Sequence, residues 1–313
     1  MRKIRSKKSN ITFIIFTYNE EKRISFPIKC YLPYGDVIIS DDSSTDNTVK
    51  IAQNLGARVI KRKVYGSLFN ENKKELDFVF SHVNTDWVFI GFADEMIPKT
   101  CLNLYKKISE DSTYKIVVQK RKTLFFDTKS EFASWGVVIK FFKKDAIDFS
   151  NNKIHQMGKF MSHVKPNEIF YLPPLDEFSI YHFQKYTTDT FISNYKSYTT
   201  AHAQSIAPSL SAFQIIVNPI ITFLTNYLLG GGFRYGIKGF IITMHFSYYT
   251  FLTYAKAYEI RNNISEESCE KKFLNKKKDL LNNSPHSSKL KRIIANGRMF
   301  FISRLFEYIK FRK

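Results

Sequence analysis

Acidic and small polar side chains follow three separate apolar runs of the sequence. The pairs are Asn19 and Glu20 after residues 11–17, Asp41 and Asp42 after residues 36–40, and Asp94 and Glu95 after residues 87–91. Grouped acidic residues can hold a divalent cation, act as a general base, or accept hydrogen bonds from a ribose and a base. A nucleoside diphosphate calls for the first and third of these roles, because its phosphates need charge neutralisation and its sugar needs acceptors.

Strand and helix signals alternate over the first 125 residues and decide whether these pairs can meet. Short β-rich runs predict strands at residues 11–17, 36–40, 57–60 and 87–91, and helical spacing predicts helices at residues 44–56 and 70–83. This alternation favours a mostly parallel sheet covered on both faces. Ligands of such sheets collect at the carboxyl ends of the strands, so the sequence predicts one shared site there.

Each polar residue also has a purely structural interpretation. Asp46 is a good helix-capping residue, and Asp42 could serve the same turn. The three strand ends taken together favour a functional site. The sequence contains neither a GxGxxG nor a GxxxxGK[ST] loop, and only 12 glycines, so a metal is the expected clamp for phosphates.

Three motifs resemble the amino-terminal half of family 2 inverting glycosyltransferases with the GT-A fold. They are IIFTYNEE (residues 14–21), VIISDDSSTDNT (residues 37–48) and DWVFIGFADE (residues 86–95). Pieces at residues 138–156, 181–203 and 218–240 are similar to the branch that contains bacterial lipopolysaccharide-core β-glucosyltransferases. The resemblance covers about residues 10–260 and implies an α/β GT-A fold, Rossmann-like with a mostly parallel central sheet and flanking helices, followed by a helical, membrane-associated region.

The resemblance implies an activity and a set of site residues. The activity is metal-dependent transfer of a sugar, with inversion, from a UDP-sugar donor to a cell-surface glycan or lipopolysaccharide-core acceptor, which can be lipid-linked. The residues implied for the nucleotide sugar are Thr17, Glu20, Asp41, Ala93 and Asp94. Asp41 would contact the base, Asp94 would bind Mg²⁺ or Mn²⁺ as the last acid of the DxD element, and His155 would be a second metal or diphosphate residue.

Two positions depart from the pattern of that family. Phe92 stands where the first acid of the DxD element is usual, and Gln156 stands where the branch commonly has Glu. An amide cannot accept a proton from a sugar hydroxyl, so the base must be another carboxylate, and Glu95 and Glu131 are the candidates. Two alternatives stay open: a catalytically lapsed nucleotide-sugar-binding protein, and a sugar nucleotidyltransferase, which usually carries a glycine-rich phosphate loop.

Most of the net charge of +20 lies in the two terminal segments. Residues 1–8 contain five basic and no acidic side chains, and residues 271–313 contain thirteen basic and two acidic ones. Basic ends on a nearly neutral body favour contact with an anionic membrane surface, although solvated charge runs would look the same. No nucleic-acid-binding module is recognisable, so nucleic acid is not expected as a partner.

Cysteine usage and the amino terminus predict the compartment. Three cysteines without a CxxC pair favour a reducing cytoplasm, and the apolar run near the start is too short for a signal-peptide core. We therefore expect a cytoplasmic protein held peripherally at the inner face of the plasma membrane.

The second half of the sequence contains two uncharged segments, residues 197–233 and 239–255. Polar side chains interrupt both, so they predict either helices half-sunk in a membrane interface or an ordinary helical core. An apolar stripe with flanking cations follows at residues 290–309, which is typical of a membrane-surface helix and also of a calmodulin target or an RNA-binding tail. The expected domains are a basic tail (1–9), a GT-A domain (10–165), a helical acceptor or membrane-proximal region (166–265) and a basic amphipathic tail (266–313).

Overall fold

The computed structural model describes most of the chain. The described residues are 9–62, 73–125, 136–150, 158–183, 187–283, 294–296 and 298–299, without the side chains of Asn194 and Ser197. Glu131, His155 and Gln156 lie outside these ranges. The chain divides into two compact units, Met1–Tyr258 and Glu259–Lys313, which we describe separately.

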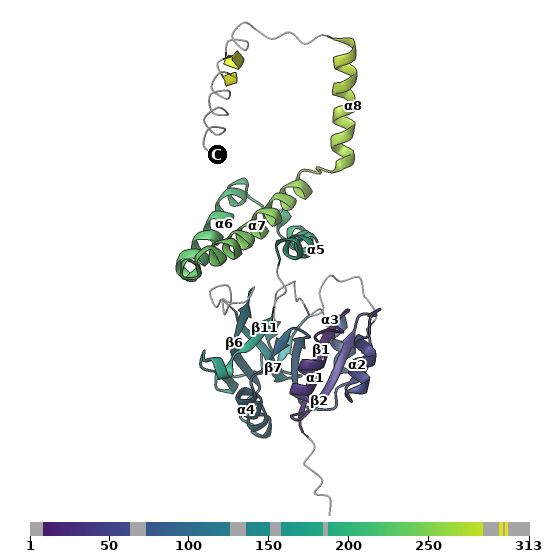
Figure 1. The fold of residues 1–313 in the computed structure, drawn as a ribbon, viewed down its shortest axis with the longest axis vertical. Coiled ribbons are helices and arrows are strands. Elements are labelled where there is room, and N and C mark those ends of the chain that lie inside the picture. The colour runs from purple at the N-terminus through teal and green to yellow at the C-terminus, as the bar shows by residue number, and fades with distance from the viewer. Residues whose placement is uncertain are drawn as a thin grey trace, which may run out of the picture. The chain divides into compact units, whose positions relative to one another are not determined.

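A mixed β-sheet forms the centre of the first unit (Figure 1). Its strands run in the order β3-β2-β1-β4-β7-β6-β11-β5, with β10 beside β6. The strands are β1 (Ile11–Thr17), β2 (Asp36–Asp41), β3 (Arg58–Lys61), β4 (Trp87–Phe92), β5 (Glu95–Met96), β6 (Ile116–Leu124), β7 (Val137–Lys143), β10 (Ile169–Tyr171) and β11 (Ile180–Phe183). Strands β3, β2, β1 and β4 are parallel, whereas β7 runs antiparallel to both β4 and β6.

Four helices belong to the sheet region, and two of them were not expected from the sequence. The helices are α1 (Ser25–Tyr31), α2 (Thr48–Asn54), α3 (Lys73–Phe80) and α4 (Lys99–Glu110). Helices α2 and α3 confirm the sequence prediction, while α1 and α4 lack the capping side chains that mark a helix start. The short strands β8 (Ile147–Asp148) and β9 (Lys159–Phe160) pair with each other, and η1 (Pro166–Glu168) and η2 (Asp176–Phe178) are single 3₁₀ turns.

The sheet is covered by apolar clusters on both faces, which is why its inner strands are almost continuously hydrophobic. All seven residues of β1 are buried; Ile11, Phe13 and Ile15 belong to one cluster, and Ile14 and Phe16 belong to the other. Trp87 and Tyr105 stack on either side of Phe141, with ring centroids 4.6 and 4.0 Å apart. The predicted α/β class is confirmed, and the sheet adds antiparallel pairing to the expected parallel order.

Helices follow the sheet in the chain. They are α5 (Thr188–Ile206), the turn η3 (Ala207–Ser209), α6 (Ala212–Leu224), the π-helical turn η4 (Thr225–Leu229), the turn η5 (Gly232–Tyr235) and α7 (Gly236–Arg261). Their buried core is small, with Ala203, Ala207, Leu210 and Ala257 at its centre. Phe125, directly after β6, packs against Ile242 and Phe246 of α7 and so connects the sheet to these helices.

In the second unit, α8 (Glu266–Asn282) follows its N-cap residue Ser265, whose hydroxyl accepts the Ser268 backbone N–H at 3.1 Å.

Candidate active site

Asp41 ends strand β2 and is the centre of the hydrogen bonds at the carboxyl ends of β1 and β2. Its Oδ1 accepts hydrogen bonds from the hydroxyls of Thr17 (3.1 Å) and Ser44 (2.5 Å), and its Oδ2 accepts the Ser44 backbone N–H at 2.8 Å. Asp41 is fully buried. The structure therefore brings together the predicted pocket residues Thr17 and Asp41.

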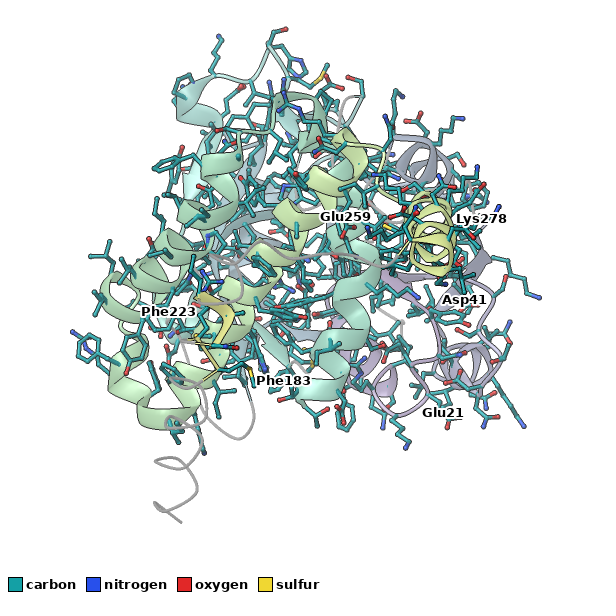
Figure 2. All side chains as sticks on the ribbon, turned by 90° about the horizontal axis from the view of Figure 1, so that it is seen from above. Glu21, Asp41, Phe183, Phe223, Glu259 and Lys278 are labelled. Carbon is teal, nitrogen blue, oxygen red and sulfur yellow. The ribbon has the colours of Figure 1, made fainter. Side chains whose placement is uncertain are left out.

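The loops after β1 and β2 are tied to each other. The Asn19 backbone N–H donates to the Ser44 hydroxyl at 2.9 Å, and the Asn19 side-chain oxygen accepts the Thr45 backbone N–H at 2.8 Å. Asn19 and Ser43 have φ angles of 53° and 59°, a left-handed conformation that Asn tolerates well and that is more costly for Ser. Figure 2 labels Asp41 and Glu21 in this part of the molecule. The cross-links hold both loops in place despite that cost.

Asp46 and Asp42, which also have a structural interpretation from the sequence, make different contacts. Asp46 accepts the Thr48 backbone N–H at 2.9 Å where α2 begins, and it also accepts the Glu21 backbone N–H at 3.1 Å. Asp46 therefore ties down the start of α2 from the residue before the N-cap position, which is Asn47, and the side chain of Asn47 makes no capping hydrogen bond. Asp42 instead forms an ion pair with Arg62 at 2.8 Å.

Asp94 lies in the turn between β4 and β5, next to a histidine that the sequence analysis did not select. The His182 Nε2 atom lies 3.4 Å from Asp94 Oδ2, and the backbone N–H of Phe183 donates to the Asp94 carbonyl at 2.8 Å. Burial by itself raises the pKa of Asp94, but the hydrogen bond from His182 and the charge of Arg23 outweigh it and lower that pKa. Asp94 is therefore held as a carboxylate.

His182 lies on β11 and is buried. Its partner in the antiparallel pairing with β5 is Glu95, and its Nδ1 lies 3.3 Å from the Thr123 hydroxyl on β6. Burial lowers the pKa of His182, although Asp94 and Glu95 act in the opposite direction. A neutral imidazole beside a carboxylate is a donor set that metals use. The one sequence signal for His182 was its place in the segment at residues 181–203.

Arg23 connects two of the predicted pocket residues. Its guanidinium forms a bidentate pair with Glu20 at 2.6 and 2.5 Å, and it also lies 3.5 Å from Asp94. Bidentate pairs of this kind fix both partners in one geometry. Arg23 is thus a cation at the edge of the acidic site, contributed by the segment between β1 and α1.

Glu95 is fully buried and paired with two cations. Lys140 Nζ lies 2.9 and 2.7 Å from its two carboxylate oxygens, and Arg121 Nε lies 2.8 Å from Oε1. Burial alone would raise the pKa of Glu95, but Lys140 and Arg121 outweigh burial and lower it. Both oxygens of this predicted base are therefore occupied by neighbouring side chains.

Phe92 takes part in the packing beside this ion pair. The Lys140 ammonium lies 4.7 Å from the centre of the Phe92 ring, and Phe16 lies on another side at 6.1 Å. A cation near an aromatic face is attracted by the ring quadrupole. The residue at the usual position of the first DxD acid thus serves as an apolar neighbour of Lys140.

The described residues fit a divalent cation in part. They contain no group of three or more His, Cys, Asp or Glu side chains placed to hold a metal. Asp94 and His182 supply one oxygen and one nitrogen donor close together. Mg²⁺ is often bound by one or two carboxylates together with substrate phosphates, and Mn²⁺ accepts imidazole more readily. The remaining ligands would have to come from a diphosphate and water.

The other predicted site residues fall into two groups. Ala93 is buried beside Asp94. The metal candidate His155 and the base candidate Glu131 lie outside the described residues. Within the described part, sequence reasoning missed His182, Arg23, Lys140 and Arg121, which all surround the turn at residues 93–95.

Comparison with known proteins decides the family. The sequence profile of Glycosyl transferase family 2 matches residues 12–169, from β1 to the start of β10. The chain belongs to glycosyl transferase family 2. It is therefore a glycosyltransferase by family, and Asp41 and Asp94 lie inside the family 2 region, whereas His182 lies beyond it.

Relatives of this family 2 chain extend beyond the profile match. An uncharacterized glycosyltransferase of Rickettsia typhi is 28% identical over 262 residues, which cover 80% of this chain and 86% of that protein. One from Rickettsia felis is 26% identical over 261 residues, which cover 80% and 89%. Among solved structures, glucosyl-3-phosphoglycerate synthase from Mycobacterium tuberculosis, in complex with Mn²⁺, UDP and glucosyl-3-phosphoglycerate, matches 38% of this chain and 45% of that protein at 22% identity and a TM-score of 0.29.

Proposed function

We propose that this family 2 chain has the GT-A fold and transfers a hexose from a UDP-sugar to a cell-surface glycan or lipopolysaccharide-core acceptor, with inversion. One observation carries the proposal: the pocket residues at the ends of β1 and β2 and the Asp94–His182 pair after β4 all belong to one sheet region. In such sheets a nucleotide lies across the carboxyl ends of the strands. The acidic character of these ends calls for a cation before a diphosphate can bind.

The nucleoside would lie over the loops after β1 and β2. Asp41 is fully buried and accepts three hydrogen bonds from Thr17 and Ser44. We infer that it fixes these loops for the nucleoside, and its direct contact with the base stays a prediction. Glu20 is half-buried and held by Arg23, so it can offer its remaining acceptor capacity to the ligand.

The diphosphate would lie at Asp94. Asp94 and His182 would hold Mg²⁺ or Mn²⁺, which when bound supplies Lewis-acid stabilisation of the leaving diphosphate. Arg23 adds a fixed positive charge beside Asp94. The low pKa of both Asp94 and His182 keeps the carboxylate charged and the imidazole neutral at pH 7, which is the pair of states that coordination needs.

The surroundings of Glu95 argue against it as the base that accepts the acceptor's proton. Glu95 is fully buried and its oxygens are paired with Lys140 and Arg121, so it is poorly placed to accept a proton from a substrate. We propose that Glu95 positions the turn that carries Asp94, while Glu131 remains the candidate base. Replacing Glu131 by Gln is expected to abolish transfer and to leave donor binding intact.

The test of this function compares Asp94→Asn with Asp111→Asn, an exposed acid after α4. Transfer and hydrolysis are measured for a panel of UDP-sugars, with added Mn²⁺ and with a chelator. We expect the unaltered chain and the Asp111 variant to turn over donor only with metal, and the Asp94 variant to lose most of that turnover. Full turnover in chelator, or an unchanged Asp94 variant, would remove the metal from the proposal.

A second candidate function is a catalytically lapsed nucleotide-sugar-binding protein. Phe92 favours it, because the first DxD acid is replaced by a ring that packs against Lys140. Calorimetry with UDP and with UDP-sugars separates the two functions. Donor binding without turnover on any acceptor would support the lapsed protein and contradict the transferase.

We also propose that the protein works in the cytoplasm at the inner face of the plasma membrane, with its basic termini on the anionic leaflet. The charge of residues 1–8 and 271–313 supports this location. Binding to anionic liposomes is expected to fall with salt and to weaken when residues 287–313 are removed. Equal binding at low and high salt would contradict the electrostatic contribution.

A further inference from the structure

Helix α6 and the turn η4 form one apolar helical rod whose outer side is exposed. The described residues include one helix long and apolar enough to cross a membrane by length and composition, Ala212–Leu229, with a mean hydropathy of 1.5 and only 6% of its residues buried. We define the α6 face as its exposed apolar side chains: Phe213, Ile216, Ile220, Ile221, Leu224, Leu228 and Leu229. Phe213 and Ile216 are 70% and 66% exposed. An exposed apolar surface of this kind marks an interaction site.

Two polar groups of α6, the Pro219 carbonyl and the Thr222 hydroxyl, contact α7. The Ser247 hydroxyl on α7 donates to the Pro219 carbonyl at 2.8 Å, and the hydroxyls of Thr222 and Thr250 lie 3.2 Å apart. Phe223, labelled in Figure 2, stacks on Tyr227 one turn later at 5.3 Å. A helix on a water-soluble protein buries its apolar side and exposes its polar side. Here the polarity is reversed, as expected for a helix that meets lipid.

The charged side chains of the helical segment at residues 190–258 are all basic, which favours an anionic partner. Residues 190–258 contain no Asp or Glu, and their charged side chains are Lys196, Arg234, Lys238 and Lys256. Arg234 is exposed in the turn between α6 and α7, and its guanidinium lies 5.6 Å from the centre of the exposed Phe233 ring. An aromatic and a cation side by side are typical anchors at the headgroup level of a membrane.

The contacts of α7 favour an orientation along the bilayer surface. Helix α6 is hydrogen-bonded to α7, and α7 packs through Ile242 and Phe246 on Phe125 of the sheet region. If α6 crossed the bilayer, α7 and its contact with Phe125 would also have to enter the lipid. Phe125 is two residues after Thr123, whose hydroxyl lies beside His182. The sheet residue on which α7 packs is thus two positions away in the chain from a residue beside the proposed diphosphate site.

We propose that the α6 face docks in the plane of an anionic lipid bilayer, and that the acceptor of the sugar is a lipid-linked molecule presented at that surface. The docking stands on the α6 face itself. The acceptor class rests on the proposed function, because it requires that the site transfers a sugar. Docking would bring the site to an acceptor confined to the membrane and reduce the search to two dimensions.

Vesicle binding of the full chain tests the docking. The probes are phosphatidylcholine vesicles with and without phosphatidylglycerol, and the variant is Ile216→Asn with Ile220→Asn. The control, Val137→Asn with Tyr171→Asn, removes two exposed apolar side chains of the sheet region that are 68% and 66% exposed. We expect the α6 variant to reduce partitioning at least about tenfold and the control to change it less than about twofold. Equal partitioning of both would overturn the proposal.

Four further measurements identify the occupant of the α6 face. Arg234→Ser is expected to weaken binding to anionic vesicles more than to neutral ones, and alkaline carbonate is expected to release the bound protein; retention after carbonate would contradict the in-plane orientation. If removal of residues 284–313 abolishes vesicle binding while the α6 variant still binds, the tail makes the membrane contact. A dimer in solution that the α6 variant converts to a monomer would give the face to a second copy, and either result would overturn the docking.

Activity measurements keep the two proposals apart. The α6 variant is expected to hydrolyse a UDP-sugar at the rate of the unaltered chain, and to lose transfer to a lipid-linked acceptor in vesicles by about the factor by which partitioning falls. Unaltered transfer to that acceptor, despite weakened vesicle binding, would overturn the lipid-linked acceptor. If no variant turns over any donor while vesicle binding still depends on Ile216 and Ile220, the proposed function fails and the docking stands.

Discussion

The sheet region and the helices α5–α7 place their polar groups in opposite ways. In the sheet region, apolar side chains fill both faces, and the charged groups are gathered at the strand ends around Asp41 and Asp94. Between α6 and α7, the hydroxyls of Thr222 and Thr250 face each other, while apolar side chains of α6 such as Ile216 are exposed. The first region thus gathers charge where we propose a charged ligand, and the second exposes an apolar surface for which we propose a lipid partner.

The two regions also differ in whether they bury acidic side chains. The sheet region buries Glu95 with Lys140, and burying ions costs solvation free energy that a hydrophobic pair would not lose. Glu95 is adjacent to Asp94, and we propose that the buried pair is retained because it positions the turn that carries Asp94. The helices avoid the cost, since residues 190–258 contain no acid at all.

The largest expected effect concerns the buried pair in the sheet region. Glu95→Gln leaves the Lys140 ammonium buried without its carboxylate, so we expect a loss of about 3–5 kcal/mol in the free energy of unfolding. Glu110→Gln, an exposed acid at the end of α4, is the control. Urea unfolding measures both, and a double variant, Glu95→Leu with Lys140→Met, is expected to recover much of the loss. A loss below about 1 kcal/mol for Glu95→Gln would show that the pair is not a fixed part of the site.

The next effect concerns His182 and pH. Because burial lowers the pKa of His182, the unfolded chain takes up this proton at a higher pH than the folded one. The contribution to stability is therefore present above the ordinary value of about 6.5 and is lost as pH falls from there through the lowered pKa. We expect metal-dependent activity to fall as the pH drops below about 6.5, which is the acid limb of its pH profile. The variant His182→Gln is expected to lack this limb and to be about a hundredfold slower. An acid limb that persists in the variant would assign it to another group.

A smaller effect is expected at Arg23. Arg23→Met removes the cation between Glu20 and Asp94, so we expect KM for the donor to rise by up to about tenfold with little change in kcat. Lys22→Met, the exposed neighbouring cation, should leave KM unchanged. Initial rates against donor concentration measure KM for both variants. An equal rise of KM in the Lys22 variant would show that Arg23 acts only through the overall positive charge.

The smallest effect is expected between α6 and α7. Thr222→Val combined with Thr250→Val replaces both partners of a polar contact by apolar groups of the same shape, so we expect stability in water to change by less than about 1 kcal/mol. Thermal unfolding of the double variant and of Thr222→Val alone measures it. A large loss in the double variant would show that this contact holds the helices together in water, and it would weaken the contrast with the sheet region.

Much of the sheet could be predicted from local patterns. The apolar runs marked β1 and β4 closely, because a strand buried on both faces is nearly continuous in hydrophobic residues. Helices α1 and α4 were missed. Helix α1 contains Pro27 and no side chain caps it, and Pro98 precedes α4, so neither segment carries the usual start signal.

For the site, the sequence by itself determined which strand ends are acidic and small, and the motifs at those ends determined the family. Only the tertiary structure decided that His182 meets Asp94 and that Glu95 is enclosed by Lys140 and Arg121. The physical reason is register. The pairing of His182 with Glu95 between β11 and β5 depends on contacts between segments far apart in the chain, and no local pattern encodes which residues such a pairing brings together.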